Sequence, residues 1–422
     1  MGQAYRLACN LFLNLPQIRL PRASASPNST SFFRPLLARG KAPQWLHLPD
    51  RKELQQSEIA DSPFRYHEVG SSSSWGRDLT FIRSPEHSEW KQVMAFPTNE
   101  SFVIGVDVGG TKVAAGLVDR NGKILSQTRT AMVADKDGAA GLAAVVAAID
   151  SVSPEVSNLG KYRPTVRGIG ICSPGPLDPK TGIVINPPNV PCWRNFPLAE
   201  QVAETYGVPV KVDNDANAAA LAESRWGAGQ GYGNIFYATI GTGIGTGILF
   251  DGRIYHGRTG AAGEGGHLSI DHRGPRCGCG KPGCVEALAA GPAIAKRARA
   301  KLREPNGHES KILDLAGGDV EAVSSEIVSR AYCEGDALAK QILDETVEFL
   351  ALWLGNIIDL LDPEVLIVGG GVASMLSPVL EELHSRIPRY SVNPRCREVP
   401  LLRAHYGADS GIAGGAALCT NF

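Results

Sequence analysis

The chain contains the same succession of strands and glycine-rich turns twice, and this repeat constrains its fold more than any other feature. The first copy reads FVIGVDV, GGTK, VAAGLVD, RNGK and ILSQTRT between residues 102 and 130, so that three strands alternate with two turns. The second copy reads NIFYATI, GTGIG, TGILF, DGR and IYHG between residues 234 and 257. The pattern predicts one β-meander used twice.

The composition excludes several classes of protein. The chain has 422 residues, 43% apolar and 20% charged, which suits two or three globular domains with sizeable cores. A formal net charge of -1, from 42 basic and 43 acidic residues, indicates no general attraction to nucleic acid or membranes. No apolar run approaches the roughly 20 residues that span a bilayer. The nine cysteines are spread unevenly, which favours a reducing compartment, and we expect a cytoplasmic protein.

The N-terminal segment 1–93 differs from the rest of the chain. From Met1 to Leu48 there is no Asp or Glu, arginine dominates the basic residues, and Ser, Pro and Phe recur without helical or strand period. Such a composition is typical of an organelle transit peptide, or of sequence that precedes a later start at Met94. We favour the start at Met94 and expect residues 1–93 to be a disordered extension outside the fold.

Each meander places a glycine-rich turn between two buried strands. Backbone N–H groups in such a turn can face a phosphate with no Cβ in the way, although a tight hairpin alone needs the same residues. Gly105–Lys112 nearly matches a P-loop, but its order is Gly-Thr-Lys and a strand follows where a P-loop has a helix. This argues against a P-loop ATPase. Asp107, at the end of the first strand, is a candidate to orient Mg²⁺ on the phosphates.

A third glycine cluster lies near the C-terminus, in PEVLIVGGGVA at 363–373. An apolar strand that runs into three glycines and a helix is by itself a weak signal of nucleotide binding. The segment before it, 337–362, has apolar residues at helical spacing and ends at Pro363. A long buried helix that leads into a strand argues for an α/β architecture.

Four motifs, in their order along the chain, resemble the ROK family of sugar kinases and repressors, and in particular its bacterial glucokinases. They are DVGGTK (107–112), IGTGIGTGILFDGRIYHGRTGAAGEGGH (240–267), CGCGKPGCVE (277–286) and LIVGGGVA (366–373). The match extends from about Phe102 to about Leu418. The resemblance implies the actin-like ATPase fold, an RNase H-like unit duplicated into two α/β domains that close over a cleft with ATP and sugar between them.

The resemblance also divides the chain and assigns its nucleotide contacts. It implies a small α/β domain over 94–213, to which 405–422 return, and a large α/β domain over 214–404 that carries the cysteine cluster. It implies ATP as the phosphoryl donor, with Mg²⁺ on its phosphates. The candidate nucleotide contacts are Asp107, Gly109, Gly110, Thr111, Lys112, Gly241, Thr242, Gly243, Gly370 and Gly371.

Three cysteines and a histidine are candidates for a zinc site. Cys277, Cys279 and Cys284, together with His267, are the number and kind of ligand that close a tetrahedral site. Glycine and proline between the cysteines permit the tight turns of such a knuckle, although reduced cysteines also cluster without a metal. Because no ligand position is left open, the zinc is expected to be structural.

The resemblance places sugar contacts around this knuckle. In the family, the histidine that matches His267 also touches the sugar, and the carboxylates that match Glu264 and Glu286 bind sugar hydroxyls. Zinc is then expected to brace the sugar site by fixing His267. The SPGP and NPPN segments resemble the family's sugar-facing loops, which makes Gly175 and Asn189 further candidates.

A polar turn between a strand and a helix, in VKVDNDANAAALAE at 210–223, offers candidates for a general base. A carboxylate at the carboxyl end of a strand is well placed for this role, and neighbouring amides can orient a hydroxyl. On the residues alone, Asp213 or Asp215 serves equally well as a helix cap. The resemblance favours Asp215, because the family's catalytic aspartate follows an asparagine, here Asn214, which is also a candidate sugar contact. Asp213 is then structural.

These features together predict an ATP-dependent glucokinase that forms glucose 6-phosphate, with Asp215 as general base. A kinase for N-acetylmannosamine, N-acetylglucosamine, fructose or allose needs much the same residues. A ROK-type repressor needs an N-terminal helix-turn-helix, and residues 1–93 contain no recognition helix. A sugar-binding protein without turnover needs neither the base nor both phosphate turns. We expect a sugar substrate, no nucleic-acid or membrane partner and, from the family's habit, a homodimer.

Overall fold

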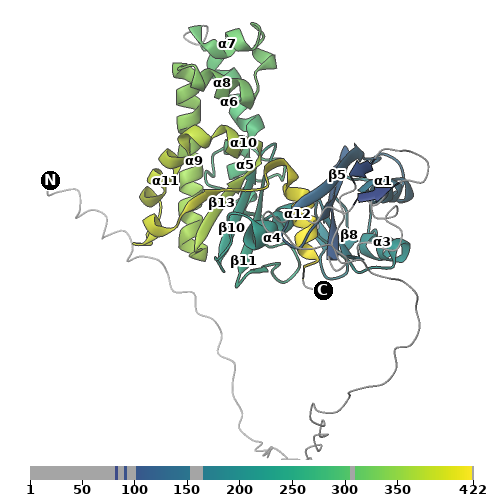
Figure 1. Ribbon diagram of the computed structural model, residues 1–422. Helices are drawn as coiled ribbons and strands as arrows, with labels where there is room; N and C mark the ends of the chain where they lie inside the picture. The colour runs from purple at the N-terminus through teal and green to yellow at the C-terminus, as the bar shows by residue number, and fades with distance from the viewer. Residues whose placement is uncertain (1–80, 84–89, 93–100, 153–164, 305–308, 421–422) are drawn as a thin grey trace, which may run out of the picture. The chain divides into compact units, whose positions relative to one another are not determined.

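Residues 81–83, 90–92, 101–152, 165–304 and 309–420 are described in a computed structural model of the chain (Figure 1). The predicted extension at 1–93 lies outside the described residues, apart from β1 (Phe81–Arg83) and β2 (Trp90–Gln92), which pair antiparallel. Met94 also lies outside them. The start at Met94 and the disorder of the extension therefore stay predictions.

Both copies of the predicted meander form part of a five-stranded sheet. In each sheet the meander is antiparallel, and two further strands extend it in parallel from its first strand. The two sheets match position by position, which confirms the predicted duplicated α/β fold. The first sheet has the order β5 (Ile124–Ala131), β4 (Lys112–Val118), β3 (Ser101–Val108), β6 (Thr165–Ser173), β9 (Val210–Asn214). The second has the order β12 (Arg253–Ile254), β11 (Ile244–Phe250), β10 (Ile235–Ile240), β13 (Val365–Gly369), β14 (Leu401–Arg403).

The second meander is shorter than predicted at its third strand. The sequence predicts a strand at IYHG, but β12 covers only Arg253–Ile254. Gly257 has a φ of 66°, in the left-handed region that favours glycine, and this turns the chain out of the sheet. The side chain of His256 instead contacts Asp213, with 2.6 Å between Nε2 and Oδ2.

Helices cover both faces of the first sheet. α1 and α3 pack on one face and α12 on the other (Figure 1), which explains why β3 is apolar along most of its length instead of alternating. Among the described residues, no helix combines the length and apolar character needed to cross a membrane. The α-helices are α1 (Gly138–Val152), α3 (Leu198–Tyr206), α4 (Asp215–Trp226), α5 (Val285–Ala289), α6 (Gly291–Leu302), α7 (Lys311–Leu315), α8 (Ser325–Cys333), α9 (Ala337–Leu361), α10 (Gly370–Met375), α11 (Leu380–Arg386) and α12 (Ser410–Leu418).

The long helix α9 forms where the apolar spacing predicts it. Asp336 caps its first turn by accepting a hydrogen bond from the backbone N–H of Ala339 at 2.7 Å. The helix ends at Asp362, which has a φ of 42°, directly before Pro363. Its buried face includes Trp353, whose ring meets that of Phe236 edge-on at 5.6 Å between centroids. α9 therefore packs directly against the second sheet.

The C-terminal helix α12 lies against the first sheet (Figure 1). The two approach so closely that only glycine fits at two points of contact. A Cβ atom on Gly170 of β6 would lie 1.8 Å from the carbonyl oxygen of Gly415. A Cβ atom on Gly105 of β3 would lie 1.8 Å from the carbonyl oxygen of Ile412. Because these strand glycines have no Cβ, the backbone of α12 packs directly against the sheet, beside the carboxyl ends of β3 and β6.

We expect the substitution Gly170→Ala to lower the free energy of unfolding by about 3 kcal/mol or more, because the backbone of α12 cannot move away from the added methyl group without losing its own packing. Denaturant unfolding of the purified protein measures this. Gly371→Ala is the matched control, because a Cβ atom at that position meets no atom within 4 Å. Equal stability losses in the two variants would contradict the close contact.

Candidate active site

The turn between β9 and α4 presents the predicted base. Asn214 is the N-cap of α4, and its side-chain oxygen accepts hydrogen bonds from the backbone N–H groups of Ala216 at 2.9 Å and Asn217 at 3.3 Å. Asp215, the first residue of the helix, accepts a bond from the N–H of Ala216 at 2.8 Å. Because Asn214 supplies the cap, capping alone does not account for Asp213 or Asp215.

The charge of Asp215 influences the carboxyl group of Asp107. Asp107 lies near the end of β3, and Asp215 follows the end of β9 on the same edge of the first sheet. Burial, and after it the charge of Asp215, raise the pKa of Asp107 to about 6, with Arg129 opposing the shift. Asp215 remains open to solvent, yet the protein packed around its carboxyl group also raises its pKa. Two carboxylates held in this way suit a proton acceptor and a cation ligand.

The pKa of Asp107 predicts how stability depends on pH. Folding raises this pKa from 3.8 to about 6, so the folded protein binds the proton more tightly than the unfolded chain does. The contribution of Asp107 to the free energy of unfolding therefore falls as pH rises from about 4 through about 6. Since Asp107→Asn removes the ionisation, the variant should be more stable than wild type by about 1–3 kcal/mol at about pH 8, with little difference near pH 4. Urea unfolding across this range tests it, and a difference independent of pH would contradict it.

The first glycine-rich turn lies next to one of the predicted sugar loops. The N–H of Gly109 donates to the carbonyl of Lys112 at 2.8 Å and closes the turn. A Cβ atom on Gly110 would lie 2.5 Å from the carbonyl oxygen of Asn189. Thr111, Lys112 and Asn189 are all exposed. The structure therefore brings a candidate phosphate contact and a candidate sugar contact together.

The second glycine-rich turn meets the third glycine cluster. The N–H of Gly241 donates to the carbonyl of Gly243 at 2.9 Å, and Thr242 between them is exposed. Gly370 has a φ of 88°, and a Cβ atom there would lie 2.5 Å from the carbonyl oxygen of Ile240. Gly370 therefore begins α10 directly against the second turn, with Gly371 following.

Gly291 is a further residue of this region that the sequence analysis missed. It begins α6, and its N–H donates to the carbonyl of Gly241 at 2.9 Å. The signal for it was a Gly-Pro pair at a helix start, which is too common to indicate a nucleotide site. Its contact with Gly241 shows that α6 also fixes the second turn.

The loop that carries Glu264 is anchored at both sides of that residue. The hydroxyl of Thr246 donates to the carbonyl of Gly263 and accepts from the N–H of Gly265 at 2.8 Å. The indole N–H of Trp353 donates to the carbonyl of Gly265 at 3.1 Å. Glu264 itself is exposed, and its carboxylate lies 4.0 Å from Nε2 of His267. The loop thus presents a carboxylate and an imidazole side by side.

The predicted sugar-facing loops leave β6 through a cis peptide bond. This bond joins Gly175 to Pro176, and Pro174 separates it from Ser173, the last residue of the strand. Two short strands follow, β7 (Leu177–Asp178) and β8 (Ile183–Val184), and they pair antiparallel. The segment is therefore ordered, as the sequence predicts. The contacts of Gly175 with a sugar stay a prediction.

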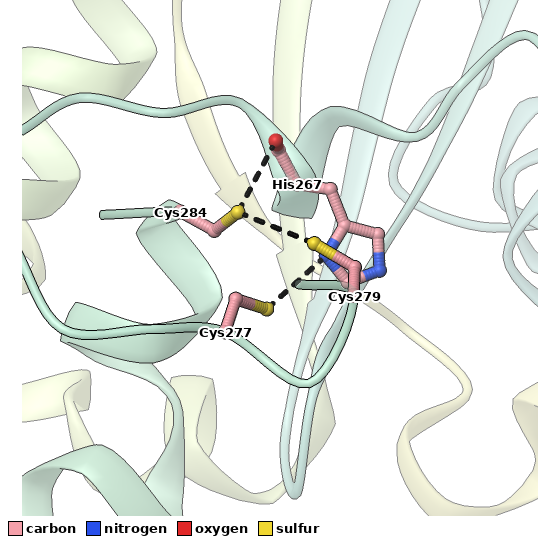
Figure 2. Close-up of side chains that lie close together, drawn as sticks. All are labelled: His267, Cys277, Cys279 and Cys284. Atoms are coloured by element: carbon pink, nitrogen blue, oxygen red, sulfur yellow. Dashed lines mark hydrogen bonds between the residues drawn. The ribbon is translucent and has the colours of Figure 1, made fainter. Parts of the chain in front are cut away.

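The four predicted zinc ligands lie together (Figure 2). Their ligand atoms all fall within 4.8 Å of one another. Sγ of Cys277 is 3.5 Å from Nδ1 of His267, and Sγ of Cys279 is 3.6 Å from Sγ of Cys284. A tetrahedral zinc with Zn–S bonds of about 2.3 Å requires sulfur separations of about 3.8 Å, so the donor set fits this ion.

Backbone geometry makes the knuckle compact. Gly283 has a φ of 62°, and a Cβ atom there would lie 1.6 Å from the carbonyl oxygen of Asp271. Gly280 has a φ of 91°, which any other residue adopts only with strain. The glycines that the sequence analysis singled out therefore permit the chain to bring the cysteines together.

Glu286 joins the knuckle to the second glycine-rich turn. One carboxylate oxygen accepts from the N–H of Ile244 at 2.9 Å. The other lies 3.3 Å from Sγ of Cys277 and 3.8 Å from Nδ1 of His267. Since Nδ1 of His267 faces the cysteines, Nε2 is the nitrogen on the Glu264 side. A sugar contact by Glu286 stays a prediction, and its contacts within the protein indicate a bracing role as well.

Comparisons with known proteins agree with this geometry. The family model described as ROK family matches residues 103–421. The glucokinase of Thermotoga maritima is 36% identical over 317 residues, which cover 75% of this chain and 96% of the relative. The crystal structure of a ROK family glucokinase from Streptomyces griseus in complex with glucose and AMPPNP is 35% identical, has a TM-score of 0.64, and covers 75% of this chain and 98% of that chain.

A relative that acts on another sugar is also similar. The N-acetylmannosamine kinase of Escherichia fergusonii is 30% identical over 319 residues, which cover 75% of this chain and 97% of the relative. The family match, the doubled sheet and the order of the four motifs lead to one conclusion: the chain belongs to the ROK family.

Proposed function

We propose that the chain is an ATP-dependent glucokinase, which transfers the γ-phosphoryl group of ATP to the C6 hydroxyl of glucose. The observation that carries the proposal is Asp215, a solvent-accessible carboxylate of raised pKa that begins α4 beside Asp107. Such a group can accept a hydroxyl proton near neutral pH. Glucose is the favoured acceptor because the glucokinase relative, at 36% identity, is more similar than the N-acetylmannosamine kinase, at 30%.

Asp215 performs the proton transfer in this proposal. The N–H of Ala216 orients its carboxylate at 2.8 Å, and the deprotonated form accepts the proton as the sugar oxygen attacks phosphorus in line. Asn214 and Glu264 flank it from the helix cap and from the anchored loop. Because a site that hydrogen-bonds particular hydroxyls discriminates against sugars that lack them, these contacts would set the acceptor.

The phosphates of ATP lie against the glycine-rich turns in the proposal. The exposed Thr111 and Lys112 of the first turn and Thr242 of the second supply donors, together with the backbone N–H groups. Asp107 is the residue that would hold Mg²⁺, which when bound neutralises charge on the transferring phosphoryl group.

The knuckle would hold a structural zinc through His267, Cys277, Cys279 and Cys284. Zinc bound there takes no part in the chemistry, because all four positions of a tetrahedron are filled by protein. It would fix the ring of His267 through Nδ1, which faces Cys277. The knuckle therefore braces the sugar side of the site.

Three further parts of the proposal rest on the family resemblance. They are a homodimer, a cytoplasmic location, and a small domain at 94–213 with 405–422 beside a large domain at 214–404. The packing of α12 on the first sheet supports the return of the C-terminal segment to the small domain.

The test is release of ADP by the purified full-length chain, with ATP and Mg²⁺, across glucose, fructose, allose, N-acetylglucosamine and N-acetylmannosamine. Turnover with glucose above all others supports the proposal. Turnover with a different sugar would redirect the acceptor and leave the base and zinc assignments in place. No turnover with any sugar, from folded and zinc-loaded protein, would contradict a kinase and favour a sugar-responsive regulator.

A further inference from the structure

A polar cluster of Asp213, Asn217 and His256 lies beside the catalytic turn. Nε2 of His256 is 2.6 Å from Oδ2 of Asp213. The other oxygen of Asp213 accepts from the side-chain N–H of Asn217 at 3.2 Å and from the backbone N–H of Asn214 at 2.7 Å. The carboxylate of Asp213 is thus held from three sides.

The contact between His256 and Asp213 has a defined direction. An ionised carboxylate only accepts hydrogen bonds, so Nε2 of His256 is the protonated ring nitrogen and donates the hydrogen bond to Oδ2 of Asp213. Only 4% of Asp213 is exposed, and a buried carboxylate is costly unless each of its oxygens has a donor. His256 is the side chain that meets this requirement at Oδ2.

Asp213 in turn fixes the chain on both sides of Asp215. Its Oδ1 holds the backbone of Asn214, the residue that caps α4. The same oxygen holds the side chain of Asn217, which is only 3% exposed and lies two residues after Asp215. A shift of Asp213 would therefore move the cap and the first turn of the helix together, and with them the base.

His256 also begins the loop that carries Glu264. Its carbonyl accepts from the N–H of Ala262 at 3.2 Å, which folds the loop back on itself. Positive φ values at Gly257 and Gly260 allow this path. A Cβ atom on Gly263 would lie 3.7 Å from Oδ1 of Asn217, so the end of the loop also passes close to the cluster.

From this geometry we propose that His256 is a positioning residue for phosphoryl transfer. Through Asp213 it holds the Asn214–Asp215 turn in a fixed relation to the loop that carries Glu264. The inference rests on the proposed function. The position of the Asn214–Asp215 turn relative to the loop matters only if Asp215 takes the proton of a sugar hydroxyl that the loop helps to bind. His256 itself touches no substrate.

The test compares two substitutions in the full-length protein. His256→Phe keeps a ring but removes the donor, and we expect kcat to fall about 10–100-fold with the KM for ATP within about twofold of wild type. His256→Gln keeps an N–H donor at similar reach, and its kcat should stay within about threefold of wild type. The control is His405→Gln, because His405 is an exposed histidine in the segment that follows β14. Its kcat and its KM for ATP should match those of wild type.

A second readout does not depend on activity. Hydrogen exchange of a peptide that spans 210–219 should be faster in His256→Phe than in wild type, and His256→Gln should restore protection. If wild type phosphorylates no sugar, the proposed function fails, while this exchange measurement still decides whether His256 fixes the turn. If His256→Phe does not fold, His256→Asn, whose donor is too short to reach Asp213, takes its place.

Three outcomes would overturn the inference. One is wild-type kcat in the variant without the donor. Another is a loss of kcat that His256→Gln fails to restore, which would indicate a general packing effect. The third is unchanged exchange at the catalytic turn, because His256 would then act without fixing it.

Discussion

Replacing Asp215 by asparagine is expected to lower kcat about 10²–10⁴-fold, the usual contribution of a general base. Asparagine has the same shape and can still accept the hydrogen bond that Ala216 donates at 2.8 Å, so the start of α4 should be preserved. What the variant lacks is a group that can take the proton of the sugar hydroxyl. Steady-state release of ADP at saturating glucose and ATP measures the effect.

The size of this loss separates the base from a helix cap. A cap contributes about 1 kcal/mol to stability, and Asn214 already fills that position. Because burial raises the pKa of Asp215, removal of its charge should leave the variant at least as stable as wild type at neutral pH, and we expect it to bind glucose in calorimetry. Asp251→Asn is the matched control, because Asp251 is exposed in the turn before β12 and its φ of 49° suits asparagine. A kcat within about threefold of wild type for Asp215→Asn would remove the assignment.

Patterns within short segments predicted the elements of the fold well. Apolar runs bounded by glycine placed β3, β4, β10 and β13, and helical spacing placed α9, because periodicity and turn residues act locally. The spacing of the cysteines and His267 indicated the zinc ligands, because a knuckle is closed by residues close in the chain.

Contacts between distant segments could not be predicted in this way. The segment IYHG leaves the sheet after Ile254, and His256 contacts Asp213 instead, a contact that no periodicity records. The buried carboxylate of Glu223 is a similar case. It accepts from the backbone N–H groups of His405 at 2.8 Å and Tyr406 at 3.1 Å, and it ties α4 to the segment before α12. From the sequence, Glu223 is one more polar residue of an alanine-rich helix.

The raised pKa of Asp107 also depends on tertiary structure. Its causes are burial and the charge of Asp215, which lies more than a hundred residues later in the chain. The sequence places each carboxylate at the end of a strand. Only the parallel order β3-β6-β9 brings the two ends to one edge of the sheet, so that the charges interact.

Removal of zinc is expected to raise the KM for glucose by about 10-fold or more and to lower the unfolding temperature, because the ion closes the knuckle and fixes His267, a predicted sugar contact. His267 faces Cys277 through Nδ1, so loss of the ion frees its ring. The variant Cys284→Ser, or treatment with a strong chelator, should show both effects together with loss of bound zinc in elemental analysis.

The KM for ATP tells whether the knuckle braces the sugar site or the whole protein. Glu286 keeps its bond to Ile244 without the metal, so the second glycine-rich turn should hold its shape and the KM for ATP should change far less than that for glucose. Cys333→Ser is the matched control, because Cys333 is a free, exposed cysteine outside the cluster. Zinc-free protein with an unchanged KM for glucose would contradict the bracing role. Equal rises in both KM values would instead mean that zinc supports the second turn as strongly as it supports His267.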